Sequence, residues 1–85
     1  MSQDKTSLFE VKSIDTELTR DILHEVYEAL KERGYNPTNQ IVGYLISGDP
    51  GYISSFKNAR LKMLEIDRSE IVKALLEGFL EKCDI

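Results

Sequence analysis

The chain has 85 residues, with 15 acidic and 11 basic side chains and a formal net charge of −4. This length predicts one small domain, and the acidic balance argues against broad non-specific binding to nucleic acid or anionic membranes. The sequence has no run of about 18 apolar residues and no apolar signal-peptide core, so we expect neither membrane insertion nor secretion. Its single cysteine cannot form an internal disulfide, and we expect a cytoplasmic protein.

Residues 1–13 are polar and lack apolar residues at helical spacing. We expect them to form a flexible N-terminal tail, in which Phe9 and Val11 can share one face of a short extended segment. Residues 14–85 are predicted to form the helical domain. Its first helix is expected to begin at Asp15 or Thr16, whose side-chain oxygens can cap it, and to stop at Gly34.

The segment "YNPTNQIVGYLISGDPG" is typical of a helix with a turn at each end. Asn36 can cap this second helix and Pro37 suits its first position. Gly48 is a natural stop, and Asp49 before Pro50 disfavours continuation of the helix. The helix carries apolar residues on too many sides for a surface helix, so we expect it to be nearly engulfed by the rest of the chain.

A third helix is predicted from Ile53 or Ser54 to Leu64, and Asp67 is expected to cap a fourth helix with a broad apolar face. The fold class is therefore mainly α, a compact bundle of about four helices with a flexible N-terminal tail. A core this small leaves apolar helix faces that need cover, so a homodimer is expected.

Catalytic and metal chemistry find little support in the sequence. His24 is the only histidine and its position fits the surface of the first helix, while Cys83 has no second histidine to activate it. A zinc site needs several Cys or His ligands. The glycine-containing turns lack the phosphate-loop pattern. We expect no enzymatic activity, no metal and no cofactor.

Nucleic-acid binding is the alternative function. A helix, a turn that contains glycine and a second helix together outline a helix-turn-helix. The second helix of this pair would be the one predicted from Ile53 or Ser54 to Leu64. It carries Lys57, Asn58, Arg60 and Lys62, which could contact phosphates and base edges. The acidic chain argues against this reading, and a charged helix surface also serves solubility alone.

A third reading concerns the tail, where Thr6 and Ser7 lie in a polar segment that a protein kinase could bind. A phosphate there would add about −1.5 to −2 charge and three strong acceptor oxygens.

The run "GYNPTNQIVGYLISGDPGYISSFKNAR" resembles the IreB family of small proteins from Gram-positive bacteria. The resemblance extends to a tail with a threonine before Phe9 and to a last helix that begins "DRSEIV". The residues that match the family motif are Gly34, Tyr35, Asn36, Pro37, Asn39, Gln40, Ile41, Val42, Gly43, Tyr44, Ser47, Gly48, Asp49, Pro50, Tyr52, Ile53, Asn58, Ala59 and Arg60.

This resemblance implies a non-enzymatic, helical and homodimeric cytosolic phosphoprotein. It implies a membrane-bound Ser/Thr kinase with extracellular cell-wall-sensing repeats as one partner, a cognate phosphatase as another, and an unknown downstream protein. It further implies a role in cell-envelope stress responses and cephalosporin resistance. Thr6 matches one phosphorylated position of the family. The second position is Gln3 here, so Ser2 or Ser7 would have to substitute.

Overall fold

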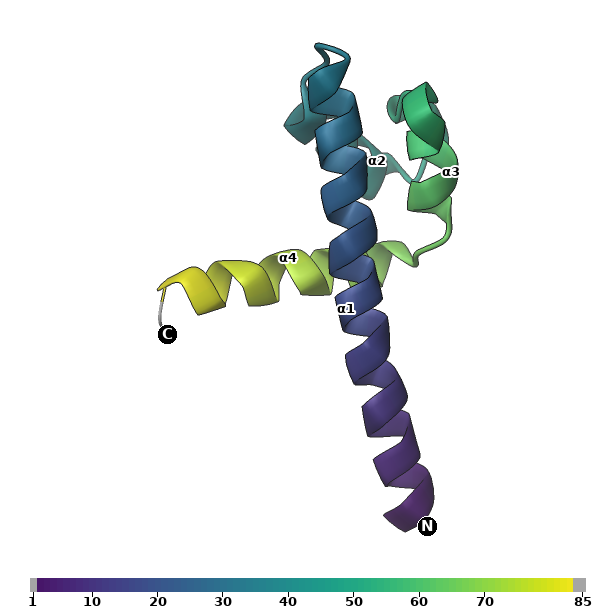
Figure 1. Cartoon of the computed structure of the whole chain (residues 1–85), viewed down its shortest axis with the longest axis vertical. Helices are drawn as coiled ribbons and strands as arrows, with labels where there is room; N and C mark the ends of the chain where they lie inside the picture. The colour runs from purple at the N-terminus through teal and green to yellow at the C-terminus, as the bar shows by residue number, and fades with distance from the viewer. Residues whose placement is uncertain (1, 84–85) are drawn as a thin grey trace.

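The computed structural model describes the backbone of residues 2–83 and the side chains of residues 16–83. This part of the chain contains four α-helices, two short 3₁₀ helices and no strand, which confirms the predicted mainly α fold (Figure 1). The elements are α1 (Ser2–Glu32), α2 (Pro37–Ser47), η1 (Pro50–Tyr52), η2 (Phe56–Asn58), α3 (Ala59–Leu64) and α4 (Arg68–Cys83).

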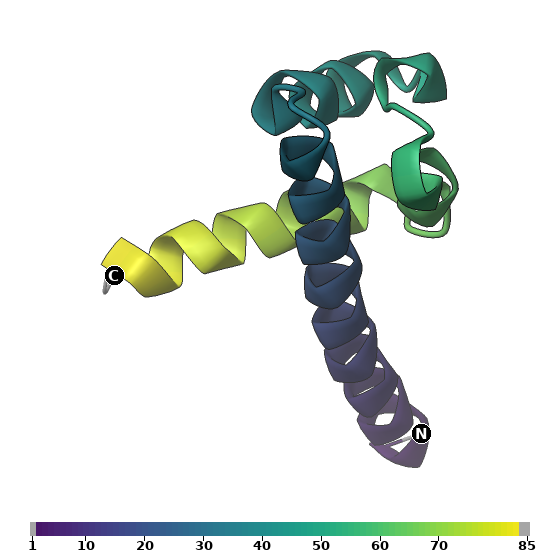
Figure 2. The ribbon, with the colours of Figure 1, turned by 45° about the horizontal axis from the view of Figure 1, so that its top comes forward.

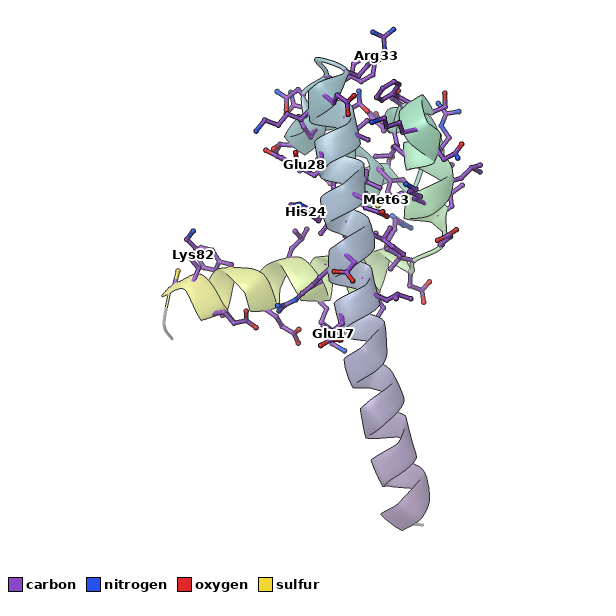
Figure 3. All side chains as sticks on the ribbon, viewed as in Figure 1. Glu17, His24, Glu28, Arg33, Met63 and Lys82 are labelled. Atoms are coloured by element: carbon purple, nitrogen blue, oxygen red, sulfur yellow. The ribbon has the colours of Figure 1, made fainter. Side chains whose placement is uncertain are left out.

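Helix α1 is the element against which each of the other three α-helices packs. Its residues Val26 and Leu30 are fully buried and lie at the centre of the core. Helices α2 and α3 lie beside the C-terminal half of α1, and α4 crosses α1 near its middle (Figures 1 and 2). Met63 points from α3 towards α1 (Figure 3). The core cluster consists of Val26, Leu30, Ile41, Tyr44, Ile53, Ala59, Met63 and Ile71.

The structure begins α1 at Ser2, earlier than the predicted start at Asp15 or Thr16. The sequence has no proline or glycine before Gly34, so nothing in it breaks a helix over this stretch. The predicted domain boundary between residues 13 and 14 falls inside this helix. That residues 1–13 form a flexible tail stays a prediction, and their side chains lie outside those that the structure describes.

Helix α2 is bounded by the residues that the sequence indicated. Gly34 adopts φ 91° and ends the turn after α1, and Gly48 adopts φ 77° at the C-terminal end of α2. Both values lie in the left-handed region that glycine tolerates best. The Asn36 side chain accepts a hydrogen bond from the Asn39 backbone N–H at 3.1 Å, and Pro37 occupies the first turn.

The prediction that α2 is nearly engulfed is wrong. Ile41 and Tyr44 are buried against α1 and the segment after α2, but the Val42 and Ile46 side chains are 44% and 80% exposed. The pattern of apolar residues shows which faces of a helix are apolar. It does not show whether other helices of the chain are placed to cover those faces. Here the described elements cover one face only.

Helix α3 is shorter than predicted. We expected it to begin at Ile53 or Ser54, but it begins at Ala59. Lys57 and Asn58 just before it adopt φ values of 52° and 61°. Two consecutive left-handed residues interrupt a right-handed helix, so the chain forms η2 first and α3 afterwards.

Helix α4 begins at Arg68, directly after Asp67, as the capping signal predicted. The Asp67 carbonyl accepts hydrogen bonds from the Glu70 and Ile71 backbone N–H groups at 3.0 and 3.2 Å. The helix continues well past α1 (Figure 1). Only Ile71 and Ala74 of its apolar face are buried, so most of that face is open.

Replacing Asn36 with alanine should lower the free energy of unfolding by about 1 kcal/mol, because the Asn39 N–H loses its acceptor at the start of α2. Asn36→Asp keeps an acceptor oxygen and should remain close to the parent chain. Urea denaturation monitored by circular dichroism measures both. Equal losses in the two variants would contradict the capping role.

Candidate functional site

The residues predicted to be phosphorylated belong to the first turns of α1. Ser2, Thr6 and Ser7 are part of its helical backbone, and their side chains lie outside those that the structure describes. Along a helix that rises 1.5 Å per residue, Thr6 is about 30 Å from the core residue Val26. The N-terminal end of α1 points away from the other helices (Figure 1). The candidate modification site is therefore remote from the core.

Several polar residues of the family motif bind the chain's own backbone. Gln40 accepts a hydrogen bond from the Ser54 N–H at 2.9 Å, and Arg60 donates from Nε to the Ile53 carbonyl at 2.8 Å. These two bonds fix the segment between η1 and α3 against α2 and α3. They satisfy backbone groups that the irregular segment leaves without helical partners.

The turn after α2 is held in the same way. The Ser47 hydroxyl donates to the Gly43 carbonyl at 2.8 Å and accepts from the Asp49 N–H at 3.0 Å. Asp49 Oδ1 in turn accepts from the Gly51 N–H at 2.9 Å. The polar members of the motif around this turn thus have structural roles that account for their presence.

The motif tyrosines serve different purposes. Tyr44 is buried in the core, whereas Tyr35 and Tyr52 remain 41% and 51% exposed. The Tyr52 ring lies over Gly43, where an added Cβ would come within 2.5 Å of Tyr52 Cδ1. Gly43 is therefore needed for the close approach of this ring to α2.

Arg68 joins the beginning of α4 to the end of α2. It donates from Nη1 to the Leu45 carbonyl at 3.0 Å, one of the carbonyls at the helix end that lack an intrahelical partner. A Cβ on Gly48 would lie 2.9 Å from the Arg68 guanidinium carbon. Gly48 thus serves twice, because it adopts the left-handed conformation and leaves room for Arg68.

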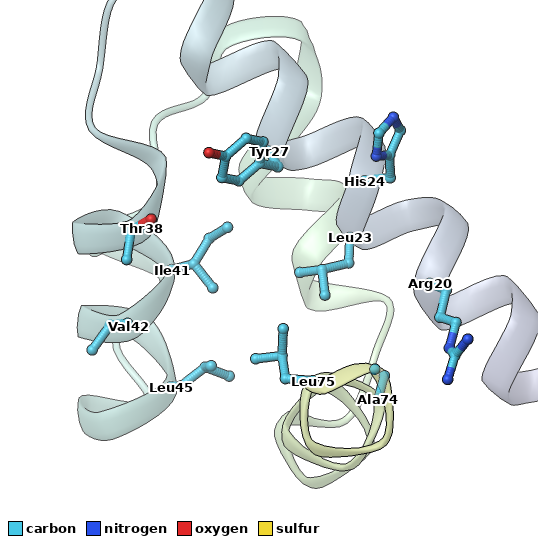
Figure 4. A pocket seen from close by; sticks show the side chains of 11 residues that line it. Arg20, Leu23, His24, Tyr27, Thr38, Ile41, Val42, Leu45, Ala74 and Leu75 are labelled. Atoms are coloured by element: carbon cyan, nitrogen blue, oxygen red, sulfur yellow. The ribbon is translucent and has the colours of Figure 1, made fainter. Parts of the chain in front are cut away.

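An apolar groove of about 520 Å³ lies between α1, α2 and α4, and we call it the three-helix groove. Figure 4 shows Leu23, Ile41, Leu45 and Leu75 pointing into the space between the helices. Each helix contributes residues at helical spacing. The lining consists of Arg20, Leu23, His24 and Tyr27 from α1, Thr38, Ile41, Val42 and Leu45 from α2, and Ala74, Leu75 and Gly78 from α4.

Arg20 ties α1 to α4 beside this groove. Its Nη1 and Nη2 atoms donate to the two carboxylate oxygens of Glu81 at 3.3 and 2.9 Å, and Glu77 lies 4.0 Å away. The hydrogen bonds to Glu81 raise the pKa of Arg20, and the same hydrogen bonds lower the pKa of Glu81. The Glu81 side chain is exposed and the Arg20 side chain is partly exposed, so screening by solvent limits how much this ion pair stabilises the fold.

The structure does not support the helix-turn-helix alternative. Residues 48–58 separate α2 from α3, and α3 spans only Ala59–Leu64, which is short for a recognition helix. The basic side chains proposed to read DNA bind the protein itself. Lys57 pairs with Glu32 at 2.8 Å, Lys62 lies 3.8 Å from Glu25, and Arg60 binds a backbone carbonyl.

The two residues considered for catalysis, His24 and Cys83, lie on different helices. His24 is exposed on α1 at the edge of the groove (Figure 3). Cys83 is exposed at the end of α4. Among the residues that the structure describes, no group of three or more His, Cys, Asp or Glu side chains is placed to hold a metal ion. No helix in this part of the chain is long and apolar enough to cross a membrane.

Gly43→Ala should destabilise the fold by roughly 1–3 kcal/mol, because the new methyl group overlaps the Tyr52 ring. The loss should be largely absent when the same substitution is made in a Tyr52→Ala background. A double-mutant cycle followed by chemical denaturation measures the coupling. If the two substitutions contribute additively, the contact between the ring and Gly43 does not carry the effect.

Comparison with known proteins gives the same family that the sequence motif indicated. A family model described as IreB regulatory phosphoprotein matches residues 4–81. A UPF0297 protein from Acetivibrio thermocellus is 45% identical over 83 residues, which cover 98% of this chain and 92% of that protein. The matched region includes Thr6, the whole of the motif around α2 and nearly all of α4. The chain therefore belongs to the IreB family of regulatory phosphoproteins.

Proposed function

We propose that the chain is a non-enzymatic, cytoplasmic regulatory phosphoprotein that acts as a homodimer. A membrane Ser/Thr kinase that senses the cell wall phosphorylates Thr6, and a cognate phosphatase reverses the modification. Through an unknown downstream protein, the two phosphorylation states modulate the cell-envelope stress response and cephalosporin resistance. The observation that carries this proposal is the family match, which spans both the Thr6 segment and the folded body.

The contacts that the motif side chains make within the folded body support a role in binding another protein. The motif side chains around α2 are engaged in caps, turns and packing, as the bonds of Asn36, Gln40 and Ser47 illustrate. What remains on the surface is an apolar groove flanked by exposed apolar side chains. Exposed apolar surface of this kind typically marks a site of protein–protein interaction.

The position of Thr6 supports control by charge. A phosphate would add about −1.5 to −2 charge to a chain that already carries −4. In the register of α1, Glu10 lies four residues after Thr6, where like charges weaken a helix. Phosphorylation can therefore loosen the first turns of α1, or it can create a binding site for an arginine-bearing partner.

The test is incubation of the chain with the organism's cell-wall-sensing Ser/Thr kinase, followed by intact-mass and fragment-ion mass spectrometry. We expect one added phosphate, located on Thr6. Thr6→Ala should abolish it, whereas Ser2→Ala and Ser7→Ala should each retain it. Circular dichroism should show that the body of Thr6→Ala keeps its helices.

An unmodified chain, or phosphate that persists in Thr6→Ala, would contradict the assignment of Thr6. Phosphate on Ser7 or Ser2 of the parent chain would show that a neighbouring hydroxyl has replaced the family's threonine.

A further inference from the structure

A second recess, of about 280 Å³, lies between α1, the link from α3 to α4, and the start of α4. We call it the acidic recess, and it shares no lining residue with the three-helix groove. From α1 it is lined by Leu18, Thr19 and Ile22. These residues face away from the α1 residues of the groove, because a helix turns by about 100° per residue. Helix α4 begins on one side of α1 and ends on the other (Figures 1 and 2).

The apolar part of the acidic recess is incompletely covered. Leu18 is 56% exposed, and Ile22 and Ile66 are partly buried. Thr19 also lines the recess and is only 4% exposed, yet its hydroxyl has no hydrogen-bond partner among the residues that the structure describes. Polar groups buried to this extent are normally paired. The recess therefore offers a bound segment both an apolar surface and an unused hydrogen-bonding group.

Three carboxylates border this apolar surface, those of Glu65, Asp67 and Glu70. None of the three forms an ion pair with a side chain that the structure describes. The cations nearest to them along the chain are engaged elsewhere. Lys62 lies 3.8 Å from Glu25. Arg68 donates to the Leu45 carbonyl at 3.0 Å. The negative charge of the recess is thus left for a partner to neutralise.

The stability of the chain itself accounts for only two of these carboxylates. Asp67 and Glu70 lie at the start of α4, where the helix dipole favours negative charge. Glu65 lies at the C-terminal end of α3, where the dipole favours a cation instead. A residue that opposes local stability beside a recess indicates a role in recognition.

We propose that the acidic recess binds a segment of the downstream protein in which lysine or arginine side chains flank an apolar side chain. The proposal rests on the proposed function and names the chemistry by which that protein is recognised. The apolar side chain packs against Leu18 and Ile22, and the Thr19 hydroxyl binds the backbone of the segment. The flanking cations pair with Glu65 and Glu70. Complementary charge of this kind gives specificity, because the recess repels an acidic segment.

A metal ion and a nucleic acid fit the acidic recess less well. Within the described part of the chain, no group of three or more His, Cys, Asp or Glu side chains is placed to hold a metal ion. The carboxylates of the recess therefore do not converge on one point. The phosphates of a nucleic acid would be repelled by them. A basic segment with an apolar anchor matches both the charge and the apolar surface.

The test uses the synthetic peptide acetyl-Lys-Arg-Leu-Arg-Lys-amide, added to the ¹⁵N-labelled full chain at low ionic strength. We expect chemical-shift changes concentrated at residues 18–22 and 65–70, and a dissociation constant that rises with salt. A peptide with glycine in place of leucine should bind about tenfold more weakly, because the burial of the leucine is lost. The acidic peptide acetyl-Glu-Asp-Leu-Asp-Glu-amide should leave the spectrum unchanged.

Glu65→Gln tests the role of the recess in the chain itself. It should weaken binding of the basic peptide about threefold, as expected for the loss of one exposed charge pair. It should not lower the free energy of unfolding, since the carboxylate opposes the dipole of α3. Glu28→Gln makes the same change in net charge on α1 outside the recess and should leave the affinity unchanged.

The outcomes separate this inference from the proposed function. A spectrum that the basic peptide leaves unchanged would overturn the acidic recess as a binding site. Shift changes spread over the acidic surface, with equal effects of Glu65→Gln and Glu28→Gln, would overturn it too and show unspecific charge attraction. Either result would leave phosphorylation of Thr6 and the homodimer standing. An unmodified Thr6 would overturn the proposed function without altering the peptide measurements.

Discussion

The packing of three helices against one, α1, is the constraint on which the rest of the structure depends. Val26 and Leu30 of α1 are fully buried, and the core residues of α2, α3 and α4 gather around them. A chain this short cannot also cover the outer sides of α2 and α4. The three-helix groove is the consequence, and side chains of α1, α2 and α4 line it (Figure 4).

The family motif is explained largely by the need to place α2 on this scaffold. Two left-handed glycines, the Asn36 cap and the Ser47–Asp49 turn set the ends of the helix, and Gly43 admits the Tyr52 ring. The motif therefore builds the body that presents the groove, while the proposed regulatory residue lies at the other end of α1. This division suits a protein that receives a signal on one segment and acts through another.

The sequence predicted the ends of α2 and the start of α4 well, because caps and left-handed glycines are local signals. It did not predict the start of α3, because lysine rarely adopts the positive φ that Lys57 has here. Asn58 tolerates positive φ, but asparagine is found in many other conformations and does not indicate it alone. It also failed on the burial of Val42 and Ile46, because burial depends on neighbours far along the chain. The groove could not be predicted either, because it forms between three helices that lie far apart in the sequence.

The central claim is that the protein is a regulatory homodimer, as proposed above, in which the second copy covers apolar surface that one chain leaves exposed on the outer half of α4. Amide hydrogen exchange at high and low protein concentration tests it most directly. The account predicts that residues 76–82 exchange slowly at high concentration and faster on dilution, while residues 22–30 of α1 stay equally protected. Exchange of residues 76–82 that is fast and independent of concentration would contradict it.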